Sequence, residues 1–80
     1  MTPTTKVDRY VDAKGQMCPM PILTLAKAMR DLQAGQVLAI TATDAGAKAD
    51  IPAWCEKTGN TLLDVTEEGG VLTFYLRKAA

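Results

Sequence analysis

The segment Cys18-Pro19-Met20-Pro21 carries the residues best suited to chemistry in this chain. An apolar run follows it at the spacing of one helix face, which predicts a helix from about Pro19 to Gln33. Proline is favoured in a first helical turn, because amides there have no intrahelical partner. Cys18 is therefore predicted at the helix entrance, where the positive end of the helix dipole favours thiolate, the nucleophilic form of cysteine. The apolar run consists of Ile22, Leu25, Ala26, Met29 and Leu32.

A purely structural explanation of the same segment is also open. Prolines are ordinary at helix starts, and free cysteines are usually buried and unreactive. Cysteine is a poorer N-cap than Ser, Thr, Asp or Asn, so a thiol at this position favours chemistry. The residues alone leave a reactive and an inert Cys18 equally open.

The chain contains no histidine, and this narrows the chemistry available to Cys18. A Cys–His dyad, an imidazole acid or base and a His-ligated metal are excluded. The second cysteine, Cys55, does not complete a Cys-x-x-Cys pair, and two cysteines do not make a structural zinc site. Nucleophilic attack on sulfur and its later release remain, and this chemistry requires neither a metal nor a cofactor.

Apolar patterning and turn residues predict six elements in the order βαβαββ. Their expected ranges are 7–12, 19–33, 36–43, 48–58, 61–66 and 71–77. Gly35 and Gly59 are expected to end the two helices in the left-handed conformation, and Asp50 is a candidate cap for the second helix. Gly69-Gly70, in a turn over 67–70, can supply the positive φ of a tight hairpin.

This order predicts an α+β fold, a two-layer α/β sandwich with two helices on one face of a four-stranded mixed sheet. Right-handed βαβ units place both helices on the same side, and the final hairpin is antiparallel. Residues 1–6 are expected to form a disordered tail, and residues 7–78 a single domain. Cys18 is then expected on a β-to-α turn at one end of the sandwich, exposed to solvent.

Composition excludes several classes of function. The nine basic and nine acidic residues are mixed and give zero net charge, which argues against binding nucleic acid through bulk electrostatics. No stretch is apolar enough for membrane insertion, and residues 1–6 lack the apolar core of a secretory signal. Two cysteines in such a chain indicate a reducing, cytoplasmic location rather than a disulfide framework.

Residues Asp12 to Pro21 read DAKGQMCPMP and resemble the N-terminal signature of the TusA family of sulfur carriers, also called SirA-like. In that family an acidic residue, a basic residue and a glycine precede a Cys-Pro-x-Pro motif. Lys14 stands where the family often has arginine, and the charge is kept. The resemblance extends over about residues 7 to 78, through the segments DIPAWC at 50–55, TGN at 58–60 and RK at 77–78.

The resemblance implies that Cys18 accepts a sulfane sulfur as a persulfide and relays it to an acceptor protein. The implied donor is a cysteine desulfurase or a rhodanese-like protein, and the implied acceptor is a sulfurtransferase or a transporter. The destinations in the family are tRNA thiolation, molybdenum-cofactor assembly, and sulfur oxidation or thiosulfate use. Gly15, Pro19 and Pro21 are expected to support the motif, and no cofactor is implied.

Two other classes of function stay open at this stage. One is a non-catalytic, thiol-based regulatory or binding module associated with a sulfur-compound transporter. The other is an RNA-binding domain, although zero net charge and few aromatic residues weigh against it. The formation of a persulfide, rather than a sulfenic acid or a mixed disulfide, would separate a carrier from a redox sensor.

A carrier must also be recognised by its donor and its acceptor. The candidates for partner docking are Lys14, Met17, Met20, Lys27 and Arg30. The alternative is that the methionines fill the core and the basic residues form a solvated face. Met29 is expected in the core, Trp54 in the core or at its edge, and Cys55 as a small buried hydrophobe rather than a resolving thiol.

Overall fold

The computed structural model describes residues 6–17 and 19–79. Cys18 and residues 1–5 of the predicted tail lie outside the described residues. The elements in chain order are β1 (Arg9–Ala13), α1 (Met20–Arg30), β2 (Val37–Ala42), α2 (Ala47–Thr58), β3 (Thr61–Glu68) and β4 (Val71–Arg77). The predicted order βαβαββ is confirmed.

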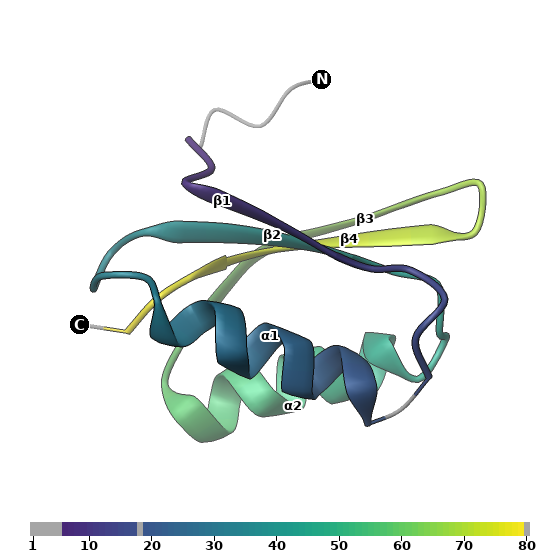
Figure 1. The fold of residues 1–80 in the computed structure, drawn as a ribbon, viewed down its shortest axis with the longest axis horizontal. Coiled ribbons are helices and arrows are strands. Elements are labelled where there is room, and N and C mark those ends of the chain that lie inside the picture. The colour runs from purple at the N-terminus through teal and green to yellow at the C-terminus, as the bar shows by residue number, and fades with distance from the viewer. Residues whose placement is uncertain (1–5, 18, 80) are drawn as a thin grey trace.

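The strands form a four-stranded sheet in the order β1-β2-β4-β3. β1 pairs with β2 in parallel, whereas β4 is antiparallel to both β2 and β3, so the sheet is mixed as predicted. Both helices cover the same face of the sheet (Figure 1). Because β1 and β2 are parallel, the β1–α1 and β2–α2 loops leave the sheet at the same end, and Cys18 belongs to the first of them.

The core lies between the helices and the sheet. In β4, Leu72, Phe74 and Leu76 are buried and alternate with half-buried residues, the period-two pattern of a strand with one covered face. α1 contributes Leu25 and Met29 to this core, which confirms the prediction for Met29. Truncating a fully buried aromatic side chain such as Phe74 to alanine typically costs about 3–5 kcal/mol, so this layer fixes how the two helices sit on the sheet.

α1 ends earlier than the predicted boundary at Gln33. The Asp31 amide donates to the Ala28 carbonyl and the Leu32 amide to the Met29 carbonyl, so the last turn tightens to i→i+3 bonds and stops. Gly35 has a φ of 86°, but it lies in the following turn. Its amide donates to the carbonyl of Lys78. The end of α1 is therefore set with help from the far end of the chain, which local sequence does not specify.

α2 begins at Ala47, so the prediction that Asp50 caps it was wrong. Asp50 instead lies in the first turn, which Gly46 precedes, and Pro52 lies inside the helix. Pro52 removes the amide that would bond to the carbonyl of Lys48 and crowds that carbonyl, and the cost is reduced because Lys48 is exposed and water can reach its carbonyl. Gly59 ends α2 in the left-handed conformation with a φ of 81°, as predicted.

The β3–β4 hairpin is longer and tighter than predicted. β3 continues to Glu68, beyond the expected end at Thr66, and the turn consists of Gly69 and Gly70 alone. Their φ values of 57° and 82° suit a two-residue turn whose twist matches that of the strands, so pairing extends to the turn itself. β1 begins two residues later than predicted, at Arg9, and ends one residue later, at Ala13.

Candidate functional site

The chain approaches position 18 through a loop that is anchored at the end of β1. Asp12 accepts hydrogen bonds from the Lys14 amide at 2.9 Å and from the Thr41 hydroxyl at 3.1 Å. These bonds, together with the charge of Lys14, hold the pKa of the Asp12 carboxyl below its ordinary value of 3.8. An ionised Asp12 therefore ties the start of the loop to its own strand and to β2.

Gly15 and Gln16 continue this anchoring. The Gln16 amide donates to the Ala13 carbonyl, closing a turn in which Gly15 has a φ of 82°, a conformation that favours glycine. The Gly15 amide also donates to the Thr43 hydroxyl at 2.9 Å. The Thr24 hydroxyl of α1 donates to Oε1 of Gln16 at 2.9 Å, so the loop is held to β2, through Thr43 just after it, and to the helix that follows.

The residues on either side of position 18 define the entrance of α1. Pro21 lies in the first turn, as predicted, whereas Pro19, which was expected inside that turn, occupies the N-cap position because α1 begins one residue later, at Met20. The Met20 amide donates to the Met17 carbonyl at 2.8 Å, and the segment between them includes position 18. No side chain caps α1 in the part of the chain that the structure describes, and no acidic residue lies in the first turn. The positive end of the α1 dipole therefore has no carboxylate in that turn to neutralise it.

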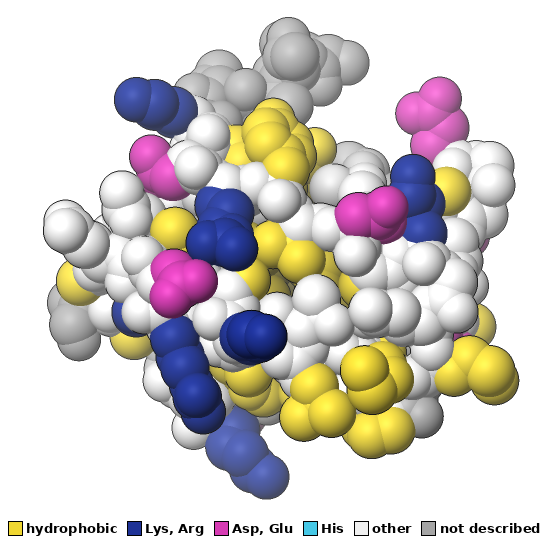
Figure 2. All heavy atoms as spheres, viewed as in Figure 1, with side chains coloured by type: hydrophobic (Ala, Val, Ile, Leu, Met, Phe, Trp, Pro, Cys, Tyr) yellow, Lys and Arg dark blue, Asp and Glu magenta, His cyan; other side chains and the backbone are white. Residues whose placement is uncertain are grey.

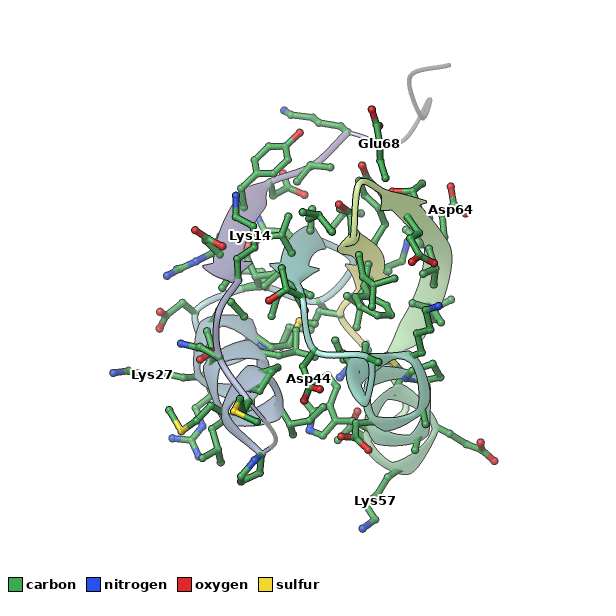
Figure 3. All side chains as sticks on the ribbon, turned by 90° about the vertical axis from the view of Figure 1, so that its right-hand side faces the viewer. Lys14, Lys27, Asp44, Lys57, Asp64 and Glu68 are labelled. Carbon is green, nitrogen blue, oxygen red and sulfur yellow. The ribbon has the colours of Figure 1, made fainter. Side chains whose placement is uncertain are left out.

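Figure 3 looks onto the end of the sandwich that carries both loops. Asp44, from the β2–α2 loop, lies there between the two helices, and its carboxylate accepts a hydrogen bond from the Gly46 amide at 3.2 Å. Lys14 lies on the sheet side of the same end, whereas Lys27 points away from α1. The sequence analysis did not single out Asp44 as a site residue. Its position after the second parallel strand was the available signal, because parallel strands bring such loops together.

Apolar side chains are exposed where α1 begins. Met17 is 75% exposed, Met20 46% and Leu23 55%, so both methionines lie at the surface rather than in the core. Figure 2 shows apolar side chains gathered at this end of the molecule. Sequence reasoning missed Leu23, although its spacing of three residues from Met20 places both on one helix face. We call Met17, Met20 and Leu23 the apolar patch.

The basic docking candidates divide into two groups. Lys27 and Arg30 are exposed and continue along α1 from Leu23 at helical spacing, so they extend the line of the apolar patch away from position 18. Figure 2 shows Lys and Arg side chains near the far end of α1. Lys14 is also exposed, but it belongs to the loop and lies nearer the sheet. The structure thus brings four of the five predicted docking residues and Leu23 into one region, with Lys14 beside it.

Cys55 is a core residue, as predicted. It is 3% exposed and packs in the hydrophobic cluster with Ile51 of the same helix. Burial raises the pKa of its thiol to about 11, because the low-dielectric core disfavours the thiolate. At neutral pH Cys55 is therefore protonated, which makes it a poor nucleophile. Trp54, its neighbour, is half-buried at the edge of the core.

Residues 6–17 and 19–79 contain no group of three or more His, Cys, Asp or Glu side chains arranged to hold a metal ion. Within the same ranges, neither helix is long and apolar enough to cross a membrane.

The fold and the loop together define a class of small α+β sandwich with a Cys-Pro-x-Pro motif at the entrance of its first helix. Residues 9–78 match the family described as Sulfurtransferase TusA, and the chain belongs to this TusA/SirA-like family. It is 49% identical over 73 residues to YrkI of Bacillus subtilis strain 168, covering 91% of this chain and 97% of YrkI. It is 42% identical over 72 residues to the sulfur carrier protein TusA of Allochromatium vinosum, covering 90% and 95% of the two chains.

A solved structure supports the fold independently. The SirA-like protein from Desulfitobacterium hafniense superimposes with a TM-score of 0.78 and covers 90% of this chain and 99% of its own. The two sequences are 23% identical over this match, so the likeness concerns the fold. The predicted family and the predicted α+β architecture are both confirmed.

Proposed function

We propose that this chain is a cytoplasmic sulfur carrier and that Cys18 is the residue that carries the sulfur. Family membership supports the carrier role. The observation that carries the assignment to Cys18 is that α1 begins two residues later, with prolines around its first turn and no acidic residue in that turn. A thiolate is favoured at such a helix end, whereas burial keeps the Cys55 thiol protonated.

The transfer needs only a thiolate and a persulfide. The Cys18 thiolate attacks the outer sulfur of a donor persulfide, R–S–SH. The S–S bond of the donor breaks as a new S–S bond forms, which gives Cys18–S–SH and the donor thiolate R–S⁻. An acceptor thiolate repeats the step and regenerates Cys18. One sulfur atom moves in each step without net oxidation. The proposed donor is a cysteine desulfurase or a rhodanese-like protein, and the proposed acceptor is a sulfurtransferase or a transporter.

Intact-protein mass spectrometry tests this proposal. After incubation with a cysteine desulfurase and cysteine, the wild-type chain should gain the mass of one sulfur atom, which a reducing agent removes. Cys18→Ser should abolish the gain, and the matched variant Cys55→Ala should retain it. Addition of oxygen or a mixed disulfide, with no sulfur gained from any donor, would favour the thiol-based regulatory module instead.

We further propose that the partner docks on the apolar patch and the basic residues beside it. The patch is exposed on both sides of position 18 in the sequence, and Lys14, Lys27 and Arg30 give its surroundings a positive charge. Basic residues near an apolar contact steer acidic partners and raise association rates, an effect that salt weakens.

Matched charge reversals test the docking proposal. Lys14→Glu and Lys27→Glu should slow sulfur loading from a protein donor at low salt, and the effect should shrink at high salt. Arg77→Glu makes the same charge change at the other end of the sheet, where Arg77 pairs with Val37 at the start of β2, and should leave the rate unchanged. Equal slowing by all three variants would show that net charge, rather than this surface, sets the rate.

A further inference from the structure

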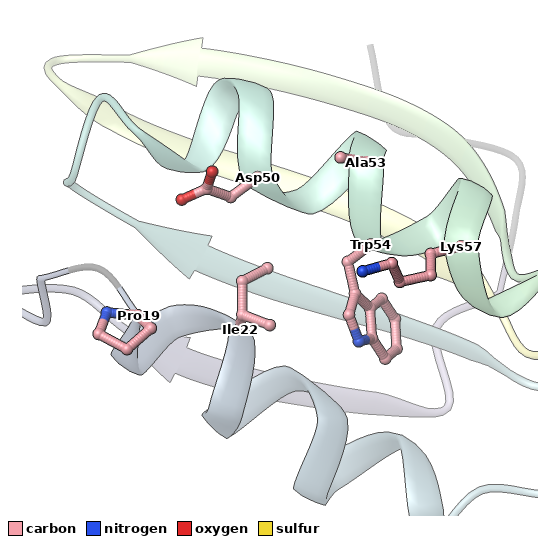
Figure 4. Close-up of a pocket in the computed structure, with 6 residues that line it drawn as sticks. All are labelled: Pro19, Ile22, Asp50, Ala53, Trp54 and Lys57. Carbon is pink, nitrogen blue, oxygen red and sulfur yellow. The ribbon is translucent and has the colours of Figure 1, made fainter.

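A hollow of about 320 Å³ opens between α1 and α2 at the start of α1. Pro19, the residue after Cys18, forms part of its wall, and Ile22 and Trp54 supply apolar surface. Figure 4 shows Pro19 and Ile22 projecting from α1 and the indole of Trp54 reaching from α2 toward α1. The volume lies at the lower end of the range of small-molecule sites, about 300–1,000 Å³.

The two ends of the hollow carry opposite charges. Asp50 and Lys57 both line it and lie about two helical turns, or about 10 Å, apart along α2. Asp44 adds negative charge at the Asp50 end, because both carboxylates lie next to Gly46. A methyl group placed on Gly46 would lie 3.4 Å from an Asp44 oxygen and 3.6 Å from an Asp50 oxygen. Among residues 6–17 and 19–79, neither Asp50 nor Lys57 has an ion-pair partner. In Figure 4 the amino end of Lys57 reaches back toward Trp54.

We propose that this hollow binds a small peptidic persulfide of tripeptide size, with an ammonium group near one end and a carboxylate at the other, such as glutathione persulfide, as a direct sulfur donor to Cys18. A tripeptide spans at most about 10 Å, which is also the separation of positions 50 and 57 along the axis of α2. The ammonium group of the donor lies at Asp50, its terminal carboxylate lies at Lys57, and its central cysteinyl residue, which carries the persulfide, lies over Ile22 and Trp54. The second carboxylate of glutathione stays in solvent. Pro19, the residue after Cys18, lines the same hollow as this central residue.

The chemical step is that of the proposed function, on which this inference rests. The Cys18 thiolate attacks the outer sulfur of the bound persulfide. The donor S–S bond breaks, the Cys18–S–SH bond forms, and the donor leaves as its thiolate, which takes a proton from water. No oxidant or reductant is consumed. The hollow contributes binding and orientation, which raises the local concentration of the donor near the thiolate.

Binding can be measured without any sulfur transfer, because Trp54 is the sole tryptophan of the chain and lines the hollow. Titration of the Cys18→Ser protein with reduced glutathione should change its fluorescence and reach saturation. Asp50→Asn and Lys57→Gln should each raise the dissociation constant about five-fold, the effect of losing one partly exposed ion pair. The matched variants Glu56→Gln and Arg77→Gln remove a charge outside the hollow and should not change it.

Loading rates then separate this inference from the carrier proposal. In single-turnover experiments, Lys57→Gln should slow loading from glutathione persulfide about five-fold and leave loading from inorganic polysulfide unchanged. A strictly linear fluorescence titration, or equal slowing of sulfur loading from both donors by Lys57→Gln, would overturn the binding site. The carrier role would still stand if the wild-type chain gains sulfur. A wild-type chain that gains no sulfur from either donor or from a protein donor would overturn the carrier role, and with it this inference.

Discussion

Replacement of Cys55 by serine tests whether the second thiol is purely structural. Cys55 is 3% exposed within an apolar cluster, so the new hydroxyl would be buried among groups that offer few hydrogen bonds. Burial of a hydroxyl in such surroundings costs about 1–3 kcal/mol. Because position 55 lies in α2, the introduced hydroxyl can donate to the carbonyl of Ile51, four residues earlier. This local bond places the expected loss toward the lower end, about 1–2 kcal/mol.

This loss corresponds to a measurable change in melting temperature. An 80-residue chain has an unfolding entropy of about 0.17 kcal/mol per kelvin, so each kcal/mol shifts the midpoint by about 6 °C. We therefore expect Cys55→Ser to melt about 6–12 °C below the wild type in calorimetry or circular dichroism. Cys55→Ala is the matched control, because it removes the sulfur without adding a polar group.

The loss of stability in the Cys55 variants should not slow their uptake of sulfur. At a temperature where both variants are folded, each should gain one sulfur atom as fast as the wild type. Native Cys55 should also resist alkylation at pH 8, because a thiol with a pKa of about 11 is ionised there to only about one part in a thousand. A folded Cys55→Ala variant that fails to accept sulfur, or rapid alkylation of Cys55 in the native state, would refute the reasoning.

Three further predictions concern the loop and its thiol. In a Cys55→Ala background, alkylation of Cys18 should show an inflection below the free-thiol pKa of about 8.5, and an inflection at or above that value would refute activation by α1. Asp12→Asn should lower the melting temperature at pH 7, and this difference should shrink on acidification, because the lowered pKa of Asp12 stabilises the fold at pH values above 3.8 and this contribution is lost as pH falls through the folded pKa. A difference that stays constant on acidification would contradict this. Gly15→Ala should destabilise the fold by about 1 kcal/mol through backbone strain alone, since φ is 82° there and a methyl group would meet nothing within 4 Å, and it should also slow sulfur loading. The control Gly35→Ala, with a φ of 86° at the other end of the sheet, should destabilise the fold without slowing sulfur loading.

Local sequence predicted the order of the elements because each carries its own periodic signal. β4 alternates buried and half-buried residues, and α1 buries Leu25 and Met29 at helical spacing. Glycines with positive φ marked the end of α2 and the β3–β4 turn for a steric reason that acts within one residue. The same local reasoning placed Pro19 and Pro21 at the entrance of α1, next to Cys18.

Boundaries and surfaces were decided by contacts between distant parts of the chain. α1 stops before Gln33. In the turn that follows, the Gly35 amide donates to the Lys78 carbonyl, and no local pattern encodes that pairing. Leu23 lies off the apolar face that the sequence predicted for this helix, but only the structure shows that it is 55% exposed beside Met17 and Met20. Asp50 was expected to cap α2, and the structure instead places it on a hollow shared with α1.

The sequence by itself determined the Cys-Pro-x-Pro motif, the family and the βαβαββ order, because motifs, turns and periodicity act over a few residues. Only the tertiary structure showed what surrounds the motif. The packing of α1 against α2 creates the hollow between Pro19 and Lys57, and the parallel pairing of β1 with β2 brings the Asp44 loop to the same end as the loop of Cys18. Both arrangements depend on how residues more than twenty positions apart meet across the sheet and between the helices, which is a property of the packed core rather than of any segment.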